Sequence, residues 1–173
     1  MLSNVLAAIA LCRQISMQWE EIHHQIPKLQ KPAMRFEEKE QAGVRLINDA
    51  YNASPESMKA ALSSLPEPKE GGKKIAVLAS MKELGAFSEA SHQEIGLFAQ
   101  KFVDHLLTLG EEAELLSKTF SEAQKPAEHF CDIKEVAKRL SELMRPGDVV
   151  LLKGSRSMRL EELLEKIYPQ CGA

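Results

Sequence analysis

The stretch VRLINDAYNASPESM, residues 44–58, decides the fold class of this chain. It opens with an apolar run, Val44 to Ile47, of the kind that forms a buried strand, and a polar, turn-forming cluster follows. Ser54 directly before Pro55 is the order typical of an N-cap and the first helical position. Asp49 is therefore predicted at the carboxyl end of a strand and beside a helix N-terminus, where open α/β sheets bind ligands. The apolar face of that helix is predicted from the helical spacing of Met58, Ala61, Leu62 and Leu65.

The rest of the chain repeats this alternation of strand and helix. Short continuous apolar runs bounded by turn residues predict buried parallel strands, and apolar residues at helical spacing lie between them. Because strand–helix–strand crossovers are right-handed, the pattern predicts an α/β fold with a Rossmann-like, doubly wound, mostly parallel sheet flanked by helices. The expected strands are 44–47, 74–79, 105–110, 128–132 and 149–152, and the expected helices are 58–65, 88–103, 111–118, 133–144 and one after residue 158.

Residues 1–32 are predicted to form two helices and a linker. The second helix is expected to bury Trp19, Ile22 and Ile26 and to stop before a proline. A helix that begins at the first residue, without room for a cap, indicates that the chain was cut from something longer. We therefore expect two parts, 1–32 and 33–173, of which the second is the α/β domain.

Composition excludes several classes of function. The chain has 173 residues, 44% of them hydrophobic and 27% charged, as in an ordinary soluble globular protein. A net charge of -3 gives no reason to expect binding to nucleic acid or to an anionic membrane. Three scattered cysteines indicate reduced thiols in a cytosol. The apolar segment Leu2 to Leu11 lacks a basic flank and is too short to span a bilayer, so we expect a cytoplasmic protein without membrane insertion.

A second strand–turn–helix arrangement follows the last expected strand, at Lys153-Gly154-Ser155-Arg156. The backbone N–H groups and the dipole of a helix that begins there would, together with the two cations, favour a bound anion. Arg156 can hold a carboxylate bidentately. The alternative is that Arg156 pairs with a nearby glutamate on the surface.

Asp49 also has two interpretations. Its two carboxylate oxygens can accept hydrogen bonds from both hydroxyls of a ribose, as an acid does in dinucleotide-binding folds. An aspartate at this position equally suits an Asx-turn or a helix N-terminus. From the spacing alone, the two interpretations have equal weight.

Three motifs resemble the C-terminal domain of the Mur ligase family. DAYNASP at 49–55 resembles D-(T/S)-Y-N-A-N-P, and KGSRSMRLE at 153–161 resembles K-G-S-R-(S/G)-M-x-L-E. MKELG at 81–85 resembles the end of G-D-M-x-E-L-G. The resemblance extends from about residue 3 to 166. The chain departs from the family pattern at Asn48, Ser54, Ala79 and Ser80, where an acid, Asn, Gly and Asp are usual.

The resemblance implies part of a ligase of peptidoglycan synthesis. Within the family it is to the members that join D-alanyl-D-alanine to UDP-N-acetylmuramoyl-tripeptide with ATP and Mg²⁺. It implies that residues 33–173 are the C-terminal Rossmann-like domain, which closes over ATP and binds the incoming dipeptide. Residues 1–32 would then be the helical tail of the ATP-binding central domain, followed by a linker.

Two shorter elements extend the resemblance to ATP contacts. SNVLAA at 3–8 resembles the tail of H-N-x-x-N-x-L-A-A, which implies that Asn4 reads the adenine edge; the alternative is a surface polar residue in the first helical turn. MRFE at 34–37 resembles G-R-(M/L)-E, which implies that Arg35 contacts the nucleotide; the alternative is a solvated arginine on an edge strand. The implied ATP-binding residues are Asn4, Arg35 and Asp49, and the implied substrate-binding residues are Tyr51, Asn52, Ser54, Lys153, Ser155 and Arg156.

The machinery for the reaction itself is missing from the sequence. No GxxxxGK(S/T) occurs, and the Gly71-Gly72 pair has no serine or threonine after its lysines. We expect no catalytic residue and no metal ligand here, because the resemblance assigns the phosphate loop and the Mg²⁺ ligands to the missing central domain. The chain alone should be inactive.

An alternative function is a stand-alone, non-catalytic α/β binding or scaffold module. The coding sequence upstream of Met1 distinguishes the two, since an in-frame phosphate loop supports the ligase and a stop codon supports the module. His92, at a family-typical position, is interpreted as a helix cap or a surface residue.

Overall fold

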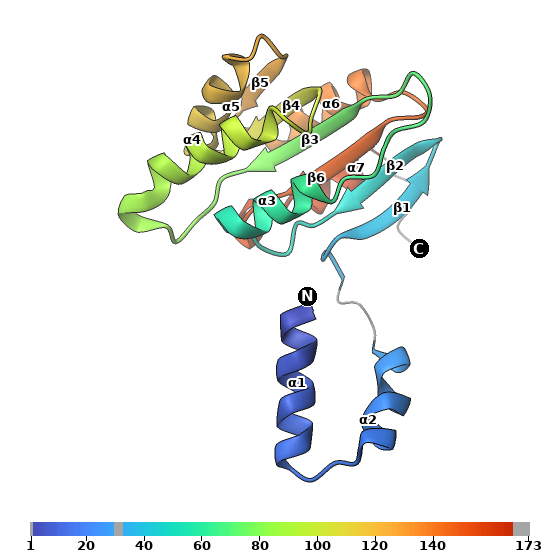
Figure 1. Cartoon of the computed structure of the whole chain (residues 1–173). Coiled ribbons are helices and arrows are strands. Elements are labelled where there is room, and N and C mark those ends of the chain that lie inside the picture. Colours follow the sequence, from blue (N-terminus) through green and yellow to red (C-terminus); the bar gives the residue numbers. More distant parts are fainter. Residues whose placement is uncertain (1, 30–32, 168–173) are drawn as a thin grey trace. The chain divides into compact units, whose positions relative to one another are not determined.

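The computed structural model describes residues 2–29 and 33–167 of the chain (Figure 1). It divides into two compact units, Met1–Pro32 and Ala33–Ala173, called unit 1 and unit 2 below. Each unit is described by itself. None of the described helices combines the length and apolar character needed to cross a bilayer.

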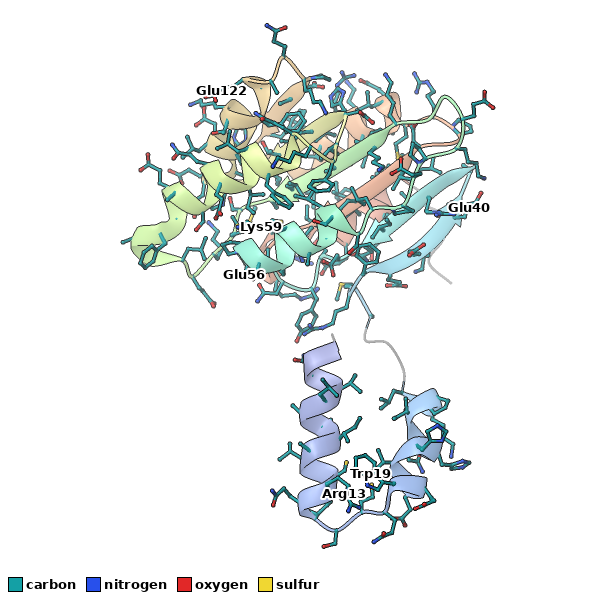
Figure 2. All side chains as sticks on the ribbon, viewed as in Figure 1. Arg13, Trp19, Glu40, Glu56, Lys59 and Glu122 are labelled. Atoms are coloured by element: carbon teal, nitrogen blue, oxygen red, sulfur yellow. The ribbon has the colours of Figure 1, made fainter. Side chains whose placement is uncertain are left out.

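Unit 1 consists of α1 (Leu2–Gln14), α2 (Trp19–Gln25) and the short 3₁₀ helix η1 (Ile26–Lys28). Among its described residues only Ile22 is buried. The prediction that Trp19 and Ile26 are buried is wrong, because 57% and 39% of their surfaces are exposed. Two short helices are too small to enclose such side chains. Instead, the guanidinium of Arg13 lies 5.0 Å from the centre of the Trp19 ring, a cation–π contact at the surface (Figure 2).

Unit 2 contains a six-stranded sheet with the order β1-β2-β6-β3-β4-β5 (Figure 1). β1 is antiparallel to β2, and the other four neighbouring pairs are parallel. This confirms the predicted α/β class with a mostly parallel sheet. The strands are β1 (Glu37–Gln41), β2 (Val44–Asn48), β3 (Lys74–Ala79), β4 (His105–Leu109), β5 (Ala127–Phe130) and β6 (Val149–Lys153).

Helices cover both faces of the sheet because successive strand residues point to opposite sides. On one face, Ile47, Ala76 and Leu151 pack in a core with α3 (Pro55–Ser63), α4 (Ser88–Ala99) and α5 (Ala113–Ser121). On the other face, Leu46, Val77 and Leu152 pack with α6 (Ile133–Leu143) and α7 (Glu162–Ile167). The helices that follow β2 and β3 thus lie on one face, and the helix that follows β6 lies on the other. In the sheet, β6 lies between β2 and β3. Such a reversal opens a crevice at the carboxyl ends of the strands, where α/β sheets bind ligands.

The β1–β2 hairpin closes the sheet at one edge. Gln41 pairs with Val44, so only Ala42 and Gly43 form the turn, and both have positive φ angles of 50° and 78°. Two positive φ values are typical of a type I′ turn, whose twist matches that of the strands. β1 itself has the sequence EEKEQ, and its charges protect the exposed edge from pairing with another chain.

The helix predicted to follow the Lys153–Arg156 turn begins later than expected. Residues Arg156–Met158 form the 3₁₀ helix η3, Arg159 has a left-handed φ of 50°, and α7 starts only at Glu162. The prediction that an α-helix begins at this turn, where its dipole would favour a bound anion, is therefore wrong in the position of the helix. A 3₁₀ turn of three residues aligns too few peptide dipoles for such a site.

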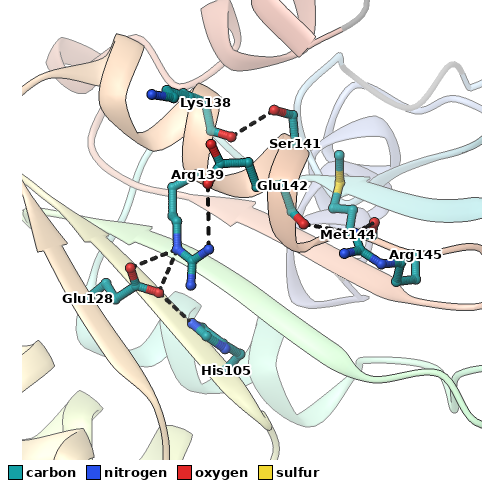
Figure 3. A network of polar contacts seen from close by, with 8 residues as sticks. All are labelled: His105, Glu128, Lys138, Arg139, Ser141, Glu142, Met144 and Arg145. Carbon is teal, nitrogen blue, oxygen red and sulfur yellow. Dashed lines mark hydrogen bonds and ion pairs between the residues drawn. The ribbon is translucent and has the colours of Figure 1, made fainter.

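A polar network joins α6 to the far edge of the sheet (Figure 3). Nε of Arg139 donates to both carboxylate oxygens of Glu128 on β5, at 2.9 and 2.7 Å. Nε2 of His105, the first residue of β4, lies 3.0 Å from the same carboxylate. The hydrogen bonds from Arg139 hold the pKa of Glu128 below its usual value. The network therefore fixes α6 over β4 and β5.

Amide hydrogen exchange should be faster in unit 1 than in the central strands of unit 2. Unit 1 has one buried side chain in its described part, whereas β3 and β6 are buried along almost their whole length. We expect amides of α1 and α2 to exchange roughly a hundredfold faster, or more, than those of β3 and β6, because weakly packed segments open locally. Native-state exchange followed by NMR on the chain measures this. Equal protection of α1 and β3 would contradict it.

Candidate functional site

An ion pair joins the carboxyl ends of β2 and β6. Nζ of Lys153, the last residue of β6, lies 2.6 Å from Oδ2 of Asp49, which directly follows β2. Only 2% of the lysine side chain and 17% of the aspartate side chain are exposed. Nζ also donates to the backbone carbonyl of Asn52 at 3.0 Å. Two residues that the sequence assigned to different ligands therefore contact each other.

The other oxygen of Asp49 is bound to the segment just after the unit boundary. Oδ1 accepts a hydrogen bond from the backbone N–H of Phe36 at 2.9 Å. The N–H of Tyr51 donates in turn to the carbonyl of Met34 at 3.1 Å. Residues 34–36 and 49–51 are thus held side by side by two hydrogen bonds.

Arg35 stacks on Tyr51 in this paired segment. The guanidinium carbon lies 4.3 Å from the centre of the tyrosine ring, within the range of a cation–π contact. Arg35 is exposed, and 45% of Tyr51 is exposed. A flat cation on an aromatic ring, next to the Asp49 carboxylate, forms a surface to which planar or anionic groups can bind.

Ser54 and Asn52 have different surroundings. Oγ of Ser54 accepts a hydrogen bond from the N–H of Ser57 at 3.3 Å, so Ser54 is the N-cap of α3, as the sequence predicted. Its hydroxyl therefore caps the N-terminus of α3. The side chain of Asn52 is exposed, and only its backbone carbonyl is used by Lys153.

The turn after β6 is mostly buried. Oγ of Ser155 accepts a hydrogen bond from the backbone N–H of Lys82 at 2.8 Å, and the Ser155 N–H donates to the Ser80 carbonyl at 3.3 Å. Of residues 153–156, only Arg156 is exposed. Ser155 therefore binds the loop after β3, whereas Lys153 binds the loop after β2.

Arg156 lies at the surface, beside one glutamate. Its Nη1 is 2.8 Å from Oε1 of Glu161 and 3.2 Å from the sulfur of Met34. More than half of the Arg156 side chain, 55%, is exposed. The glutamate pairing considered from the sequence is thus present, and the remaining guanidinium edge is accessible to a carboxylate.

The sequence did not identify a further set of charged residues at the same sheet edge. Nζ of Lys82, after β3, lies 2.7 Å from Oε2 of Glu112, after β4, and this hydrogen bond lowers the pKa of Glu112 to about 2. A cleft of about 480 Å³ lies beside Glu112, lined by residues at the starts of α4 and α5. The signal that could have found both residues is their position just after a predicted strand.

His92 is fully buried at this cleft, so its interpretation as a cap or surface residue is wrong. Its Nε2 accepts a hydrogen bond from the Met81 N–H at 3.0 Å, and its Nδ1 lies 2.7 Å from the Ser88 carbonyl. Burial lowers the pKa of His92, which favours the neutral ring. The imidazole therefore fixes the loop after β3.

Asn4 belongs to the other unit, where it is exposed in the first turn of α1. The structure thus gathers Asp49, Lys153, Arg35 and Tyr51 in unit 2 and leaves Asn4 in unit 1. No group of three or more His, Cys, Asp or Glu side chains suited to a metal ion is present in the part of the chain that the structure describes.

Together, the fold and these loops define a Rossmann-like α/β domain whose polar residues converge at the carboxyl edge of a mostly parallel sheet. The family described as Mur ligase, glutamate ligase domain, matches residues 34–156. This chain belongs to the Mur ligase family.

Its relatives are full-length ligases. The chain is 36% identical over 171 residues to the UDP-N-acetylmuramoyl-tripeptide--D-alanyl-D-alanine ligase of Bacillus subtilis, covering 95% of this chain and 37% of the relative. The ligase of the same name from Escherichia coli is 33% identical over 170 residues, with 96% and 36% covered. The chain therefore spans little more than a third of these curated relatives.

Solved structures agree with this placement. The crystal structure of MurF ligase from Thermotoga maritima in complex with ADP is 32% identical, with a TM-score of 0.76, and the match covers 96% of this chain and 37% of that one. A MurF structure from Acinetobacter baumannii matches with a TM-score of 0.83 at 25% identity, with 96% and 37% covered.

Breaking the buried ion pair should destabilise unit 2. Asp49→Ala or Lys153→Ala leaves an uncompensated buried charge, so we expect each to lower the free energy of unfolding by about 3 kcal/mol. Urea denaturation followed by circular dichroism measures the change. The control is Lys69→Ala, whose lysine is 65% exposed and pairs with Glu40, and which should leave the midpoint unchanged. Equal midpoints for Lys153→Ala and Lys69→Ala would contradict the expectation.

Proposed function

We propose that this chain is the C-terminal part of an ATP-dependent ligase that joins D-alanyl-D-alanine to UDP-N-acetylmuramoyl-tripeptide in peptidoglycan synthesis. We call that longer enzyme the complete ligase. The observation that carries the proposal is the convergence of Asp49 and Arg156 on one sheet edge, in a chain 36% identical to a ligase of that name. Because its substrates are nucleotide-linked and ATP is required, we place the complete ligase in the cytoplasm.

Asp49, Arg35 and Asn4 are proposed to contact ATP. Among the described residues, each oxygen of the Asp49 carboxylate accepts one short hydrogen bond, from the Phe36 N–H and from Lys153, and a carboxylate has about four lone-pair sites. The residues present therefore fit a ribose, whose hydroxyls can donate to the remaining sites. Arg35, exposed on Tyr51, fits an anionic or planar part of the nucleotide. ATP, when bound, supplies the activation of the tripeptide carboxyl group.

Mg²⁺ is proposed to bind outside this chain. The family resemblance assigns the Mg²⁺ ligands to the central domain, so we place the donors in the remaining two thirds of the complete ligase. We likewise propose that the chain alone does not catalyse ligation, because its sequence contains no phosphate loop.

Arg156 is proposed to bind the free carboxylate of the incoming dipeptide. It is the exposed member of residues 153–156, and a guanidinium forms paired hydrogen bonds with a carboxylate. The exposed side chains of Tyr51 and Asn52 lie on the neighbouring loop and are proposed to contact the dipeptide as well. Ser54 supports this loop by capping α3.

Steady-state kinetics of the complete ligase test these roles. Asp49→Asn should raise the KM for ATP about 10- to 100-fold, because hydrogen bonds to a charged group are worth roughly 1.5–3 kcal/mol. Arg156→Ala should raise the KM for D-alanyl-D-alanine by a similar factor, with the KM for ATP little changed.

Two matched substitutions serve as controls. Asp104→Asn alters a carboxylate that binds the Lys74 N–H at the opposite, amino end of β3. Arg159→Ala alters an arginine that is 73% exposed and pairs with Glu162. Both should leave the two KM values unchanged. An unchanged KM for D-alanyl-D-alanine in Arg156→Ala would show that this residue does not bind the dipeptide.

The chain by itself should bind ATP very weakly. It offers ribose and adenine contacts without a phosphate loop, so we expect a dissociation constant of about 1 mM or weaker. Isothermal titration of the 173-residue chain measures this, with Asp49→Asn as the control that should abolish the residual heat. A dissociation constant below about 1 µM would instead favour a stand-alone nucleotide-binding module.

A further inference from the structure

We propose that Lys153 is a positioning residue of the complete ligase: it sets the orientation of the Asp49 carboxylate and so controls the affinity for ATP without touching ATP or the dipeptide. This inference rests on the function proposed above. It replaces the direct substrate contact that the resemblance implied for Lys153.

The contacts of Lys153 use all of its donors. A lysine ammonium has three N–H groups, and Nζ has three acceptors within reach. These are Oδ2 of Asp49 at 2.6 Å, the carbonyl of Asn52 at 3.0 Å and the carbonyl of Asp49 at 3.4 Å. With 2% of the side chain exposed, no donor remains for a ligand.

Those contacts fix the direction in which Asp49 presents its oxygens. The carboxylate is held from two sides, by Lys153 at Oδ2 and by the Phe36 N–H at Oδ1. Its plane is therefore set before a ligand arrives, and the remaining lone pairs have defined directions. Without the ammonium, the side chain keeps only the bond to Phe36 and can rotate about it.

Lys153 also shares a turn with the residue proposed to bind the dipeptide. Two residues separate Lys153 from Arg156, and the second of them, Ser155, is hydrogen-bonded to the loop after β3. The backbone of the turn is therefore anchored independently of Asp49. Replacing the Lys153 side chain should disturb the nucleotide side while Arg156 keeps its place.

This arrangement gives a kinetic signature. In the complete ligase, Lys153→Met should raise the KM for ATP about 10- to 100-fold, as Asp49→Asn does, because both act through one carboxylate. The KM for D-alanyl-D-alanine should rise less than the KM for ATP: the loop of Asn52 loses one bond to its carbonyl, but Arg156 stays anchored through Ser155. In the double variant Asp49→Asn/Lys153→Met, the KM for ATP should be no higher than in the worse single variant, since interacting residues are not additive.

Two further variants keep the test decisive if Lys153→Met folds poorly. Lys153→Arg retains the charge, but a planar guanidinium cannot reproduce the three directions of the ammonium, so the KM for ATP should still rise at least about 3-fold. Lys69→Met is the control. It removes an exposed lysine that pairs with Glu40 and not with Asp49, so both KM values should stay unchanged. Circular dichroism confirms that each variant is folded.

The outcomes separate this inference from the proposed function. If Asp49→Asn does not alter the KM for ATP, the ribose role of Asp49 is wrong, and the inference falls with it. If Asp49→Asn raises that KM while Lys153→Arg and any folded Lys153→Met do not, the positioning role alone is overturned. Direct substrate contact would be shown instead by two results together. The Lys153 variant would raise the KM for the dipeptide, and in the double variant its increase in the KM for ATP would multiply that of Asp49→Asn.

Discussion

A lysine ammonium that is taken out of water must be given an opposite charge and hydrogen-bond acceptors, and unit 2 is arranged around meeting that requirement for Lys153. The desolvation of two charges offsets most of the attraction between them, so the pair with Asp49 contributes little net stability. Its main effect is to fix the positions of the segments that it joins. The ends of β2 and β6 are fixed to each other, and the loop that contains Tyr51 and Asn52 is held by a carbonyl bond to the same ammonium. The segment after the unit boundary joins this arrangement through Phe36.

The position of β6 explains why one turn can serve two loops. β6 lies between β2 and β3, so the residues after it face the loops of both neighbours. Lys153 is directed to one side and Ser155 to the other. Arg156 is the next residue and is exposed, so its backbone is supported by buried contacts while its side chain remains accessible. A functional side chain next to buried anchors is better positioned than one on a free loop.

The sequence was sufficient where burial alone determines structure. The run at 74–79 predicted β3 with its observed bounds, because the five consecutive apolar residues Ile75 to Ala79 are typical of a strand buried on both faces. β1 was considered only as an edge strand around Arg35, and its bounds were missed because EEKEQ has no apolar alternation. The late start of α7 was missed because nothing in the spacing of Leu160 and Leu163 reveals the left-handed Arg159 before them. In the site, motifs pointed to Asp49 and Arg156, but the pairing of Asp49 with Lys153 depends on strand order, which no local pattern contains.

The insertion of β6 has a consequence for how the domain is made. Lys153 and Asp49 are separated by 104 positions in the chain, and β2 does not pair with β3. During synthesis, β2 and β3 therefore emerge long before the strand that belongs between them, and the gap can be filled only when β6 leaves the ribosome. Contacts of such long sequence separation close slowly, because the loop entropy is lost before the contact is gained. The edge that we propose to bind ligands is thus absent from every shorter nascent chain, and it is assembled in the same event that completes the sheet.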